Sequence, residues 1–327
     1  MKKTLLILTA IIILCPKSFA ASSDNIALLT QKGFFDNQTQ AGKQSGKTSF
    51  MQTVCSNPSE EVKQVLNTHL KYANTYNFEK LKGLYANSYT NADGLTKDIY
   101  FDLIKKTWES YPNIKYKMSI KNIDVNSNMA IAQVNEEAFA TTNSTSGLTG
   151  ESGVLESTSS SVYYLEKINN EWLVTTDHIL YEKTFLGYGS AKDMQIDLAA
   201  PSQITAGTSY TAALKMNVPK DSLVIASVGK ENITYPQTIA EEVFRKLPDD
   251  GILERVFKSN DKNINEYAVS SFGITKADLE RGKGIKVYIT GLGFMMTRVN
   301  VIPKNEFIKV AQEDKAPTEM PKDEKTK

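Results

Sequence analysis

Hydrophobic positions recur along the chain with two periods, and the change of period separates a helical part from a strand-rich part. After Asn57, apolar residues fall three or four positions apart, as on one face of an amphipathic helix. The run Asn57-Pro58-Ser59-Glu60 predicts a helix start, because it supplies a capping side chain, a first-turn proline and a glutamate three residues after the cap. Asn77 predicts a second, short helix. A third is expected from about Thr96 to Trp108, ended by Tyr111-Pro112.

From Ile114 onward the period falls to two, which indicates half-buried strands. Further strands are expected from Met129 to Thr141, from Ser161 to Ile168 and from Trp172 to Lys183. The polar, glycine-rich segment from Thr142 to Ser160 is interpreted as a long hairpin excursion, with a mobile lid as the alternative. Three helices followed by a four-stranded antiparallel meander predict an α+β fold for residues 57–188.

Strand signals continue over residues 194–308, with turn residues every ten or so positions. This spacing predicts a β-sandwich, and the lack of a Cys…Trp…Cys pattern favours an immunoglobulin-like domain over a true immunoglobulin domain. Thr238-Ile239-Ala240-Glu241 is a capping box and predicts one short helix through Val243, Phe244 and Leu247. Gly291-Leu292-Gly293 predicts a turn between two strands. It lacks the third glycine of a phosphate-binding loop.

The two ends of the chain have compositions unlike the rest. Lys2 and Lys3, the apolar stretch Thr4–Cys15 and the step Ser18-Phe19-Ala20 have the layout of a secretory signal peptide cleaved after Ala20. An uncleaved membrane anchor is the alternative, although the apolar stretch is short for a membrane span. Residues 21–56 are expected to form a disordered linker and residues 309–327 a disordered tail. We therefore expect a secreted or periplasmic mature protein.

Charge and cysteine content narrow the function classes. Loss of three lysines with the first twenty residues changes the formal net charge from +1 to −2, which leaves no electrostatic footprint for nucleic acid. No other apolar stretch is long enough for a membrane span, so none is expected in the mature chain. Cys55 would be the only cysteine of the mature chain, as a free thiol, a reactive thiol or an intermolecular bridge. No metal-ligand spacing and no cofactor motif occurs, so no metal or cofactor is expected.

The hairpin from Tyr163 to His178 reads as a lysine, a tight Asn169-Asn170 turn, Trp172, apolar residues and Asp177-His178. With the first helix and the Tyr76–Ala86 step, it makes residues 57–185 resemble the NTF2-like (SnoaL-like) superfamily. The resemblance implies a curved sheet wrapped around three helices to form a cone-shaped cavity, and often a dimer through the sheet. Members include isomerases, dehydratases and hydrolases, and also proteins that only bind partners.

Asp177 and His178 are the candidate catalytic residues, because family enzymes place acid–base groups inside the cone. Neighbouring strand residues point to opposite faces, so only one of the two can face the cavity. Strict alternation puts His178 on the face of Trp172, Val174 and Leu180; packing or a dimer surface is the alternative role. Aromatic residues could line the cavity or simply fill the core: Tyr72, Tyr76, Tyr85, Tyr89, Trp108, Tyr116 and Trp172.

The sequence favours an exported, non-enzymatic binding or interaction protein of the cell envelope, whose first domain binds a small apolar molecule or a protein partner. A cavity enzyme, an isomerase or hydrolase with His178 or Asp177 as acid/base, is the alternative, and a purely structural envelope component is the third. A homodimer through the NTF2-like sheet is also expected. The reason is the pattern of the closing strand, where Leu173, Ile179 and Tyr181 are predicted to form an apolar face that must be covered.

Overall fold

The computed structural model describes residues 57–218, 220–237, 242–280 and 284–304, together with the backbone of residues 4–6 and 13–15. Those two short pieces are strands β1 (Thr4–Leu6) and β2 (Ile13–Cys15), which pair antiparallel within the predicted signal peptide. The predicted linker, with Cys55, and the predicted tail lie outside the described residues, as does the capping box Thr238–Glu241.

Three helices form close to the ranges that the sequence predicts. α1 (Pro58–Asn74) begins at Asn57, whose side chain accepts a hydrogen bond from the Ser59 amide. α2 (Phe78–Gly83) begins at Asn77, whose side chain accepts from the Lys80 amide. α3 (Lys97–Ser110) follows Thr96 and ends before Tyr111. The two asparagine caps are confirmed, because each satisfies a free first-turn amide without help from tertiary contacts. Thr96 makes no side-chain cap hydrogen bond.

The helices pack on an antiparallel meander of four long strands: β3 (Lys115–Asn126), β4 (Met129–Thr145), β5 (Ser152–Ile168) and β6 (Glu171–Gly189). The α+β order is confirmed. The predicted excursion from Thr142 to Ser160 is wrong in its second half, because β5 already begins at Ser152. Ser157 and Ser159 face the core. Since these inward positions are polar, the alternation of a half-buried strand is hidden in the sequence.

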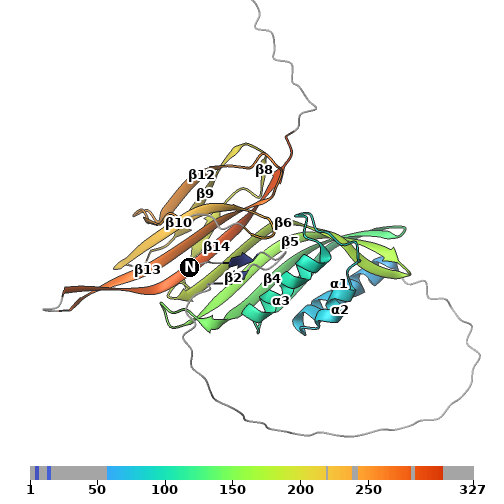
Figure 1. Cartoon of the computed structure of the whole chain (residues 1–327), viewed down its shortest axis with the longest axis horizontal. Coiled ribbons are helices and arrows are strands. Elements are labelled where there is room, and N and C mark those ends of the chain that lie inside the picture. Colours follow the sequence, from blue (N-terminus) through green and yellow to red (C-terminus); the bar gives the residue numbers. More distant parts are fainter. Residues whose placement is uncertain are drawn as a thin grey trace, which may run out of the picture.

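The sheet does not end at β6. β14 (Gly284–Ile302) pairs with residues 183–189 of β6, and β13 (Glu266–Glu280), β10 (Ser222–Asn232) and β11 (Arg245–Lys246) follow beyond it. β8 (Gln203–Thr205) adds a short parallel pairing with the end of β14. One nine-stranded sheet therefore runs across the boundary predicted between residues 188 and 194 (Figure 1).

A second sheet covers part of the long one. It contains β7 (Ile196–Ala199), β9 (Ser209–Met216) and β12 (Ile252–Lys258). Its core includes Leu214 of β9, Phe272 of β13 and Met295 of β14, with Phe185 of β6 packed against it. Leu186, the next residue of β6, packs instead in the cluster beneath the helices. Neighbouring strand residues face opposite sides, so the helices and the second sheet lie on opposite faces of the long sheet (Figure 1).

Two smaller predictions in the second half are wrong. Gly291 and Gly293 lie within β14, not in a turn, and a Cβ at Gly293 would overlap the Phe272 ring. These glycines permit close packing rather than chain reversal. The short helix expected through Val243 and Phe244 is absent from its described residues, which lead into strand β11.

Candidate ligand cavity

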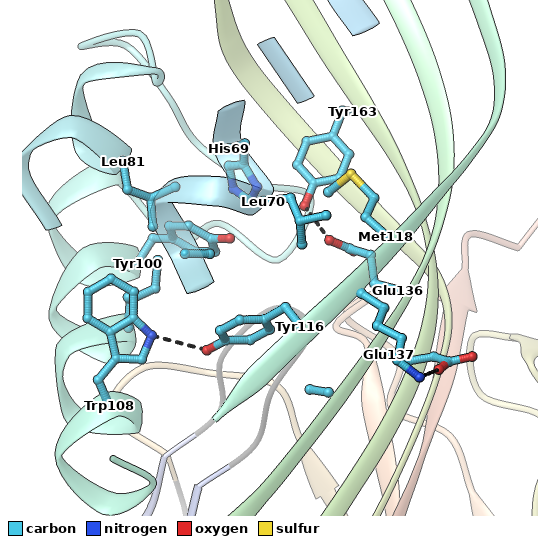
Figure 2. A pocket seen from close by; sticks show the side chains of 14 residues that line it. His69, Leu70, Leu81, Tyr100, Trp108, Tyr116, Met118, Glu136, Glu137 and Tyr163 are labelled. Atoms are coloured by element: carbon cyan, nitrogen blue, oxygen red, sulfur yellow. Dashed lines mark hydrogen bonds and ion pairs between the residues drawn. The ribbon is translucent and has the colours of Figure 1, made fainter. Parts of the chain in front are cut away.

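A cavity of about 50 Å³ lies between the helices and the first strands of the sheet. Figure 2 shows side chains from α1, α3, β3, β4 and β5 directed toward this space. The helical wall is mainly apolar and aromatic, with His69 as its imidazole, and the sheet contributes the carboxyl group of Glu136 and the phenols of Tyr116 and Tyr163. The lining residues are His69, Leu70, Ala73, Leu81, Tyr100, Ile104, Trp108, Tyr116, Lys117, Met118, Glu136, Glu137, Ala138 and Tyr163.

Glu136 is the acidic group of the cavity interior. It lies at an inward position of β4, between Val134 and Ala138, and the Tyr163 hydroxyl donates a 3.1 Å hydrogen bond to its Oε1. Its Oε2 is buried and has no hydrogen-bond partner among the described residues, and the same holds for the hydroxyl oxygen of nearby Ser161. Burial raises the pKa of Glu136 to about 7; the Tyr163 hydrogen bond and Ser161 oppose this rise, and the charge of Asp177 adds to it. The carboxyl group is therefore poised to exchange a proton near neutral pH.

His69 of α1 faces the same space in a neutral form. Burial lowers the pKa of its imidazole to about 4. Nε2 shares a 2.8 Å hydrogen bond with the Tyr85 hydroxyl, and buried Nδ1 has no partner within the described part of the chain. The ring also meets Tyr163 edge-on, with centroids 6.0 Å apart. A neutral imidazole with one free nitrogen can donate or accept a hydrogen bond, depending on its tautomer.

Aromatic side chains form the remaining wall. The Trp108 indole Nε1–H donates a 3.1 Å hydrogen bond to the Tyr116 hydroxyl, which links α3 to β3 (Figure 2). Burial raises the pKa of Tyr116, so its phenol stays protonated. Tyr100 lies beside Tyr85, with ring centroids 5.5 Å apart. The wall therefore combines π-faces with a few hydroxyl groups, and its polarity is concentrated on the Glu136 side.

Of the aromatic residues proposed from sequence, Trp108 and Tyr116 line the cavity. Tyr76 lies outside the lining and donates its hydroxyl hydrogen to the Ile114 carbonyl, and the Trp172 indole donates to Glu61. Tyr72, partly buried, packs against the core beside the cavity. Tyr85 and Tyr89 are fully buried core residues that also lie outside the lining.

The structure places Asp177, and not His178, on the inner face of β6. The register with β5 shifts between Tyr164 and Leu165, so that Thr175 is an extra residue and the inward phase moves from Val174 to Asp177. The alternation expected from sequence is therefore wrong beyond this bulge. Ile179 follows Asp177 on the inner face by alternation. A second shift, between Ser160 and Ser161, makes exposed Leu180 the extra residue and moves the inward phase from Ile179 to Glu182.

Asp177 is buried and accepts a 2.6 Å hydrogen bond from the Tyr89 hydroxyl. Burial raises its pKa to about 6, and the Tyr89 hydrogen bond opposes that rise. His178 is partly buried on the other face, where burial, followed by the charge of Arg298, lowers its pKa. Neither residue lines the cavity.

Further polar groups extend the inner face toward the second half of the chain. Arg298 of β14 is fully buried and forms an ion pair with Asp93, with 2.5 Å between Nη2 and Oδ1. Glu182 of β6 accepts a 2.6 Å hydrogen bond from the Tyr267 hydroxyl, and burial raises its pKa to about 7. Its Oε1 makes no hydrogen bond within the described residues.

Sequence reasoning missed Glu136, Tyr163 and His69 as cavity residues. A signal for Glu136 was present, because it shares the inward phase of Ala132 and Val134 in an alternating strand. A carboxyl group at an inward position is costly to bury, and therefore marks a functional candidate. His69 and Tyr163 offer no such signal, because both residue types are common in cores.

Among the described residues, no three or more His, Cys, Asp or Glu side chains gather as metal ligands would. A search of the described helices also finds none with the length and apolar character of a membrane span.

No family model matches the chain, and no match is found among curated proteins. Solved structures similar to it include a nuclear transport factor 2 (NTF2-like) superfamily protein from Salmonella enterica, with 16% identity, a TM-score of 0.31, and coverage of 37% of this chain and 88% of that one. A conserved protein from Planctomyces limnophilus has 14% identity and a TM-score of 0.32, over 36% and 91% of the two chains. Hexachlorocyclohexane dehydrochlorinase from Novosphingobium barchaimii has 8% identity and a TM-score of 0.30, over 37% and 84%. At these values the likenesses assign no activity to the chain.

Proposed function

We propose that this chain is an exported binding protein whose NTF2-like part holds a small molecule in the cavity beside Glu136. The observation that carries the proposal is an aromatic cavity with one buried carboxyl oxygen, Glu136 Oε2, left without a hydrogen bond. Apolar walls with few polar groups are the usual composition of a ligand pocket. The layout of residues 1–20 supports export to the cell envelope.

The size of the cavity limits the ligand. A volume of about 50 Å³ accommodates one or two water molecules or a ligand of a few heavy atoms. A larger ligand requires side chains of the lining to move. Lys117 and Glu137 are the exposed residues of that lining, and their charged groups pair on the outer face of the sheet, 3.5 Å apart. The ligand we propose is therefore compact, with an apolar body against Trp108 and Tyr116 and a polar group at Glu136.

Ligand binding is testable with a fluorescent reporter already in the chain. Trp108 and Trp172 are its two tryptophans, so Trp172→Phe leaves the cavity tryptophan as the only one. Small aromatic and aliphatic compounds that enter the cavity should change Trp108 emission with saturation. Native mass spectrometry of the protein purified from its own envelope should detect the natural ligand. Failure of every compound to change Trp108 emission, together with a ligand-free natural protein, would contradict the proposal.

A second candidate is a cavity enzyme, and a specific observation supports it. The pKa of Glu136 near 7 suits a general acid or base, and the neutral His69 ring lies in the same cavity. This moves the acid–base role expected for His178 or Asp177 to Glu136. If a natural ligand is found, its slow chemical conversion by the protein, abolished by Glu136→Gln, would favour the enzyme.

The second half of the chain supplies a two-layer β unit, and we propose an immunoglobulin-like docking role for it. The support is the packing of the β7–β9–β12 sheet on strands β10, β13 and β14. Its partner would be a protein of the cell envelope. The corresponding test is capture of such a partner by the purified chain. Truncation of either terminus should leave capture intact, and substitution of exposed β12 residues should abolish it.

We also propose a homodimer through the outer face of strands β4–β6. Ile131 of β4 and Tyr164 of β5 are register partners there, with exposed fractions of 45% and 37%, and Tyr181 of β6 is 38% exposed. Ile179, expected on this face from sequence, is instead buried on the inner one. Exposed apolar side chains that gather on one face favour association.

The dimer predicts that Ile131→Lys shifts the mature chain from dimer to monomer in light scattering at tens of micromolar, because a charge replaces apolar contact area. Lys121→Glu on the neighbouring strand β3 is the control and should leave the dimer intact. A monomeric unsubstituted protein at that concentration would refute self-association.

A further inference from the structure

The inner face of the sheet carries more buried acid than base. Glu136, Asp177 and Glu182 face the core together with Asp93, and the only fully buried cation among the described residues there is Arg298. Arg298 pairs with Asp93, and its charge also lowers the pKa of Asp177 and of Glu182. The other three carboxyl groups are each held by a tyrosine hydroxyl: Tyr163 on Glu136, Tyr89 on Asp177 and Tyr267 on Glu182. A buried carboxylate without a cation is costly, so each must be protonated or must find a positive partner.

Only Glu136 of these three carboxyl groups opens onto the cavity. Its register partner on β5 is Ser159, which in turn lies opposite Glu182 on β6. One oxygen of each of these three side chains is buried without a hydrogen bond in the described part of the chain: Glu136 Oε2, Ser159 Oγ and Glu182 Oε1. These three oxygens, side by side across β4, β5 and β6, can therefore accept further hydrogen bonds. A donor that enters from the cavity reaches Glu136 first.

The walls around Glu136 suit a cation as well. Tyr100, Trp108, Tyr116 and Tyr163 present aromatic rings to the cavity, and a ring face attracts a cation through its quadrupole. His69 adds no competing positive charge, since it is neutral. Lys117 is the one positively charged residue of the lining, and its ammonium group pairs with Glu137 on the exposed, outer face of the sheet.

We propose that the cavity selects a small organic amine, whose ammonium group binds Glu136 Oε2 while its carbon body packs against the aromatic wall. This inference rests on the proposed binding function and names its ligand class. The ammonium supplies the missing positive charge and donates charge-assisted hydrogen bonds, which are stronger than those between neutral groups. A neutral alcohol of the same size offers one hydrogen-bond donor and no charge.

Binding of an amine at Glu136 should depend on pH. An ammonium ion binds the ionised carboxylate, so below pH 7 the amine must displace the proton of Glu136. Affinity should therefore rise from pH 5.5 to pH 8, with release of up to one proton at the lower pH and almost none at the higher. Asp177 and Glu182 are the other acids that act on Glu136 from the sheet, with Asp93 and Arg298 beyond them. His69 and the tyrosines share the cavity, and Lys117 and Glu137 pair on the opposite face of the sheet.

Matched pairs of probes test the inference on the full mature chain. Isothermal titration calorimetry compares ethylamine with ethanol and benzylamine with benzyl alcohol, at pH 5.5 and 8, in two buffers of different ionisation enthalpy. We expect the amine of each bound pair to bind at least about tenfold more tightly at pH 8. Glu136→Gln keeps the shape of the side chain and its hydrogen bond from Tyr163. It should reduce the preference to about twofold and abolish proton release.

Glu166→Gln, on the exposed face of β5, is the matched control and should keep the full preference. Equal binding of amine and alcohol, or an amine preference that survives Glu136→Gln, would overturn the amine inference and leave the binding function standing. Absence of binding by all four probes, with unchanged Trp108 emission, would overturn both. Circular dichroism of each variant establishes that the fold is retained.

Discussion

At the scale of single residues, the buried acids decide how the protein responds to pH. Burial raises the pKa of Glu136 and Glu182 to about 7 and that of Asp177 to about 6, above their ordinary values of 4.5 and 3.8. The folded state therefore holds protons that the unfolded chain has already released. The stability that these protonated groups contribute is fully present below the unfolded pKa values, and it is lost as pH rises through the folded ones.

This predicts that the free energy of unfolding falls between about pH 4.5 and pH 7.5. Glu136→Gln removes one of the titrating groups, so its stability should depend less on pH and should exceed that of the unsubstituted chain by about 1–3 kcal/mol at pH 8. Urea unfolding at pH 4.5, 6 and 8 measures how the free energy of unfolding changes with pH in the unsubstituted chain and in Glu136→Gln. Glu166→Gln is exposed and should leave the slope unchanged. If Glu136→Gln kept the pH slope of the unsubstituted chain, folding would not raise the pKa of Glu136.

At the scale of elements, strand packing depends on where side chains are absent. β14 pairs with β13, and Gly293 of β14 lies opposite Phe272 of β13 in the register. A Cβ at Gly293 would overlap the Phe272 phenyl ring. At Gly273 of β13 the nearest atoms to an added Cβ are 3.7 Å away, an ordinary contact. The two glycines lie in the same strand pair and differ mainly in the space available.

Gly293→Ala should therefore destabilise the protein by about 1–3 kcal/mol, because the buried Phe272 ring must leave its position in the core. Gly273→Ala should change stability by less than about 0.5 kcal/mol. Chemical unfolding of the two variants side by side measures the difference. Equal effects would mean that loss of glycine, rather than overlap with Phe272, sets the cost.

At the scale of the whole molecule, the Asp93–Arg298 ion pair ties the two halves of the chain together. Asp93 lies in the loop before α3, and Arg298 lies on β14, 205 residues later in the sequence. The Asn265 amide also donates to Asp93, at 2.8 Å. Because both charges are buried, removal of one partner leaves the other uncompensated in the interior.

Arg298→Met should lower the free energy of unfolding by about 3–5 kcal/mol, and the double variant Asp93→Asn with Arg298→Met should recover part of that loss. Thermal unfolding measures both. Lys246→Met, which removes an exposed pair with Asp249, should leave the Tm unchanged. A double variant no more stable than Arg298→Met would contradict the account of an uncompensated charge.

The sequence by itself determined the elements whose signals are local. Asn57 and Asn77 cap their helices with their own side chains, and the alternation from Ile114 to Lys121 specifies the first part of strand β3. These features predicted the α+β order, because caps and periodicity act over a few residues. The serines of β5 hid a strand, since their burial depends on the groups opposite them in the fold.

Only the tertiary structure decided which residues form the cavity and how far the sheet extends. The bulge at Thr175 reverses the phase of β6 and turns Asp177 inward in place of His178, and a bulge is set by pairing with β5, which no local pattern records. Glu136 meets His69 and Trp108 only because helices and strands distant in sequence pack together. The sheet continues from β6 to β14 through hydrogen bonds between strands about a hundred residues apart. Sequence periodicity does not determine which strands pair in this way.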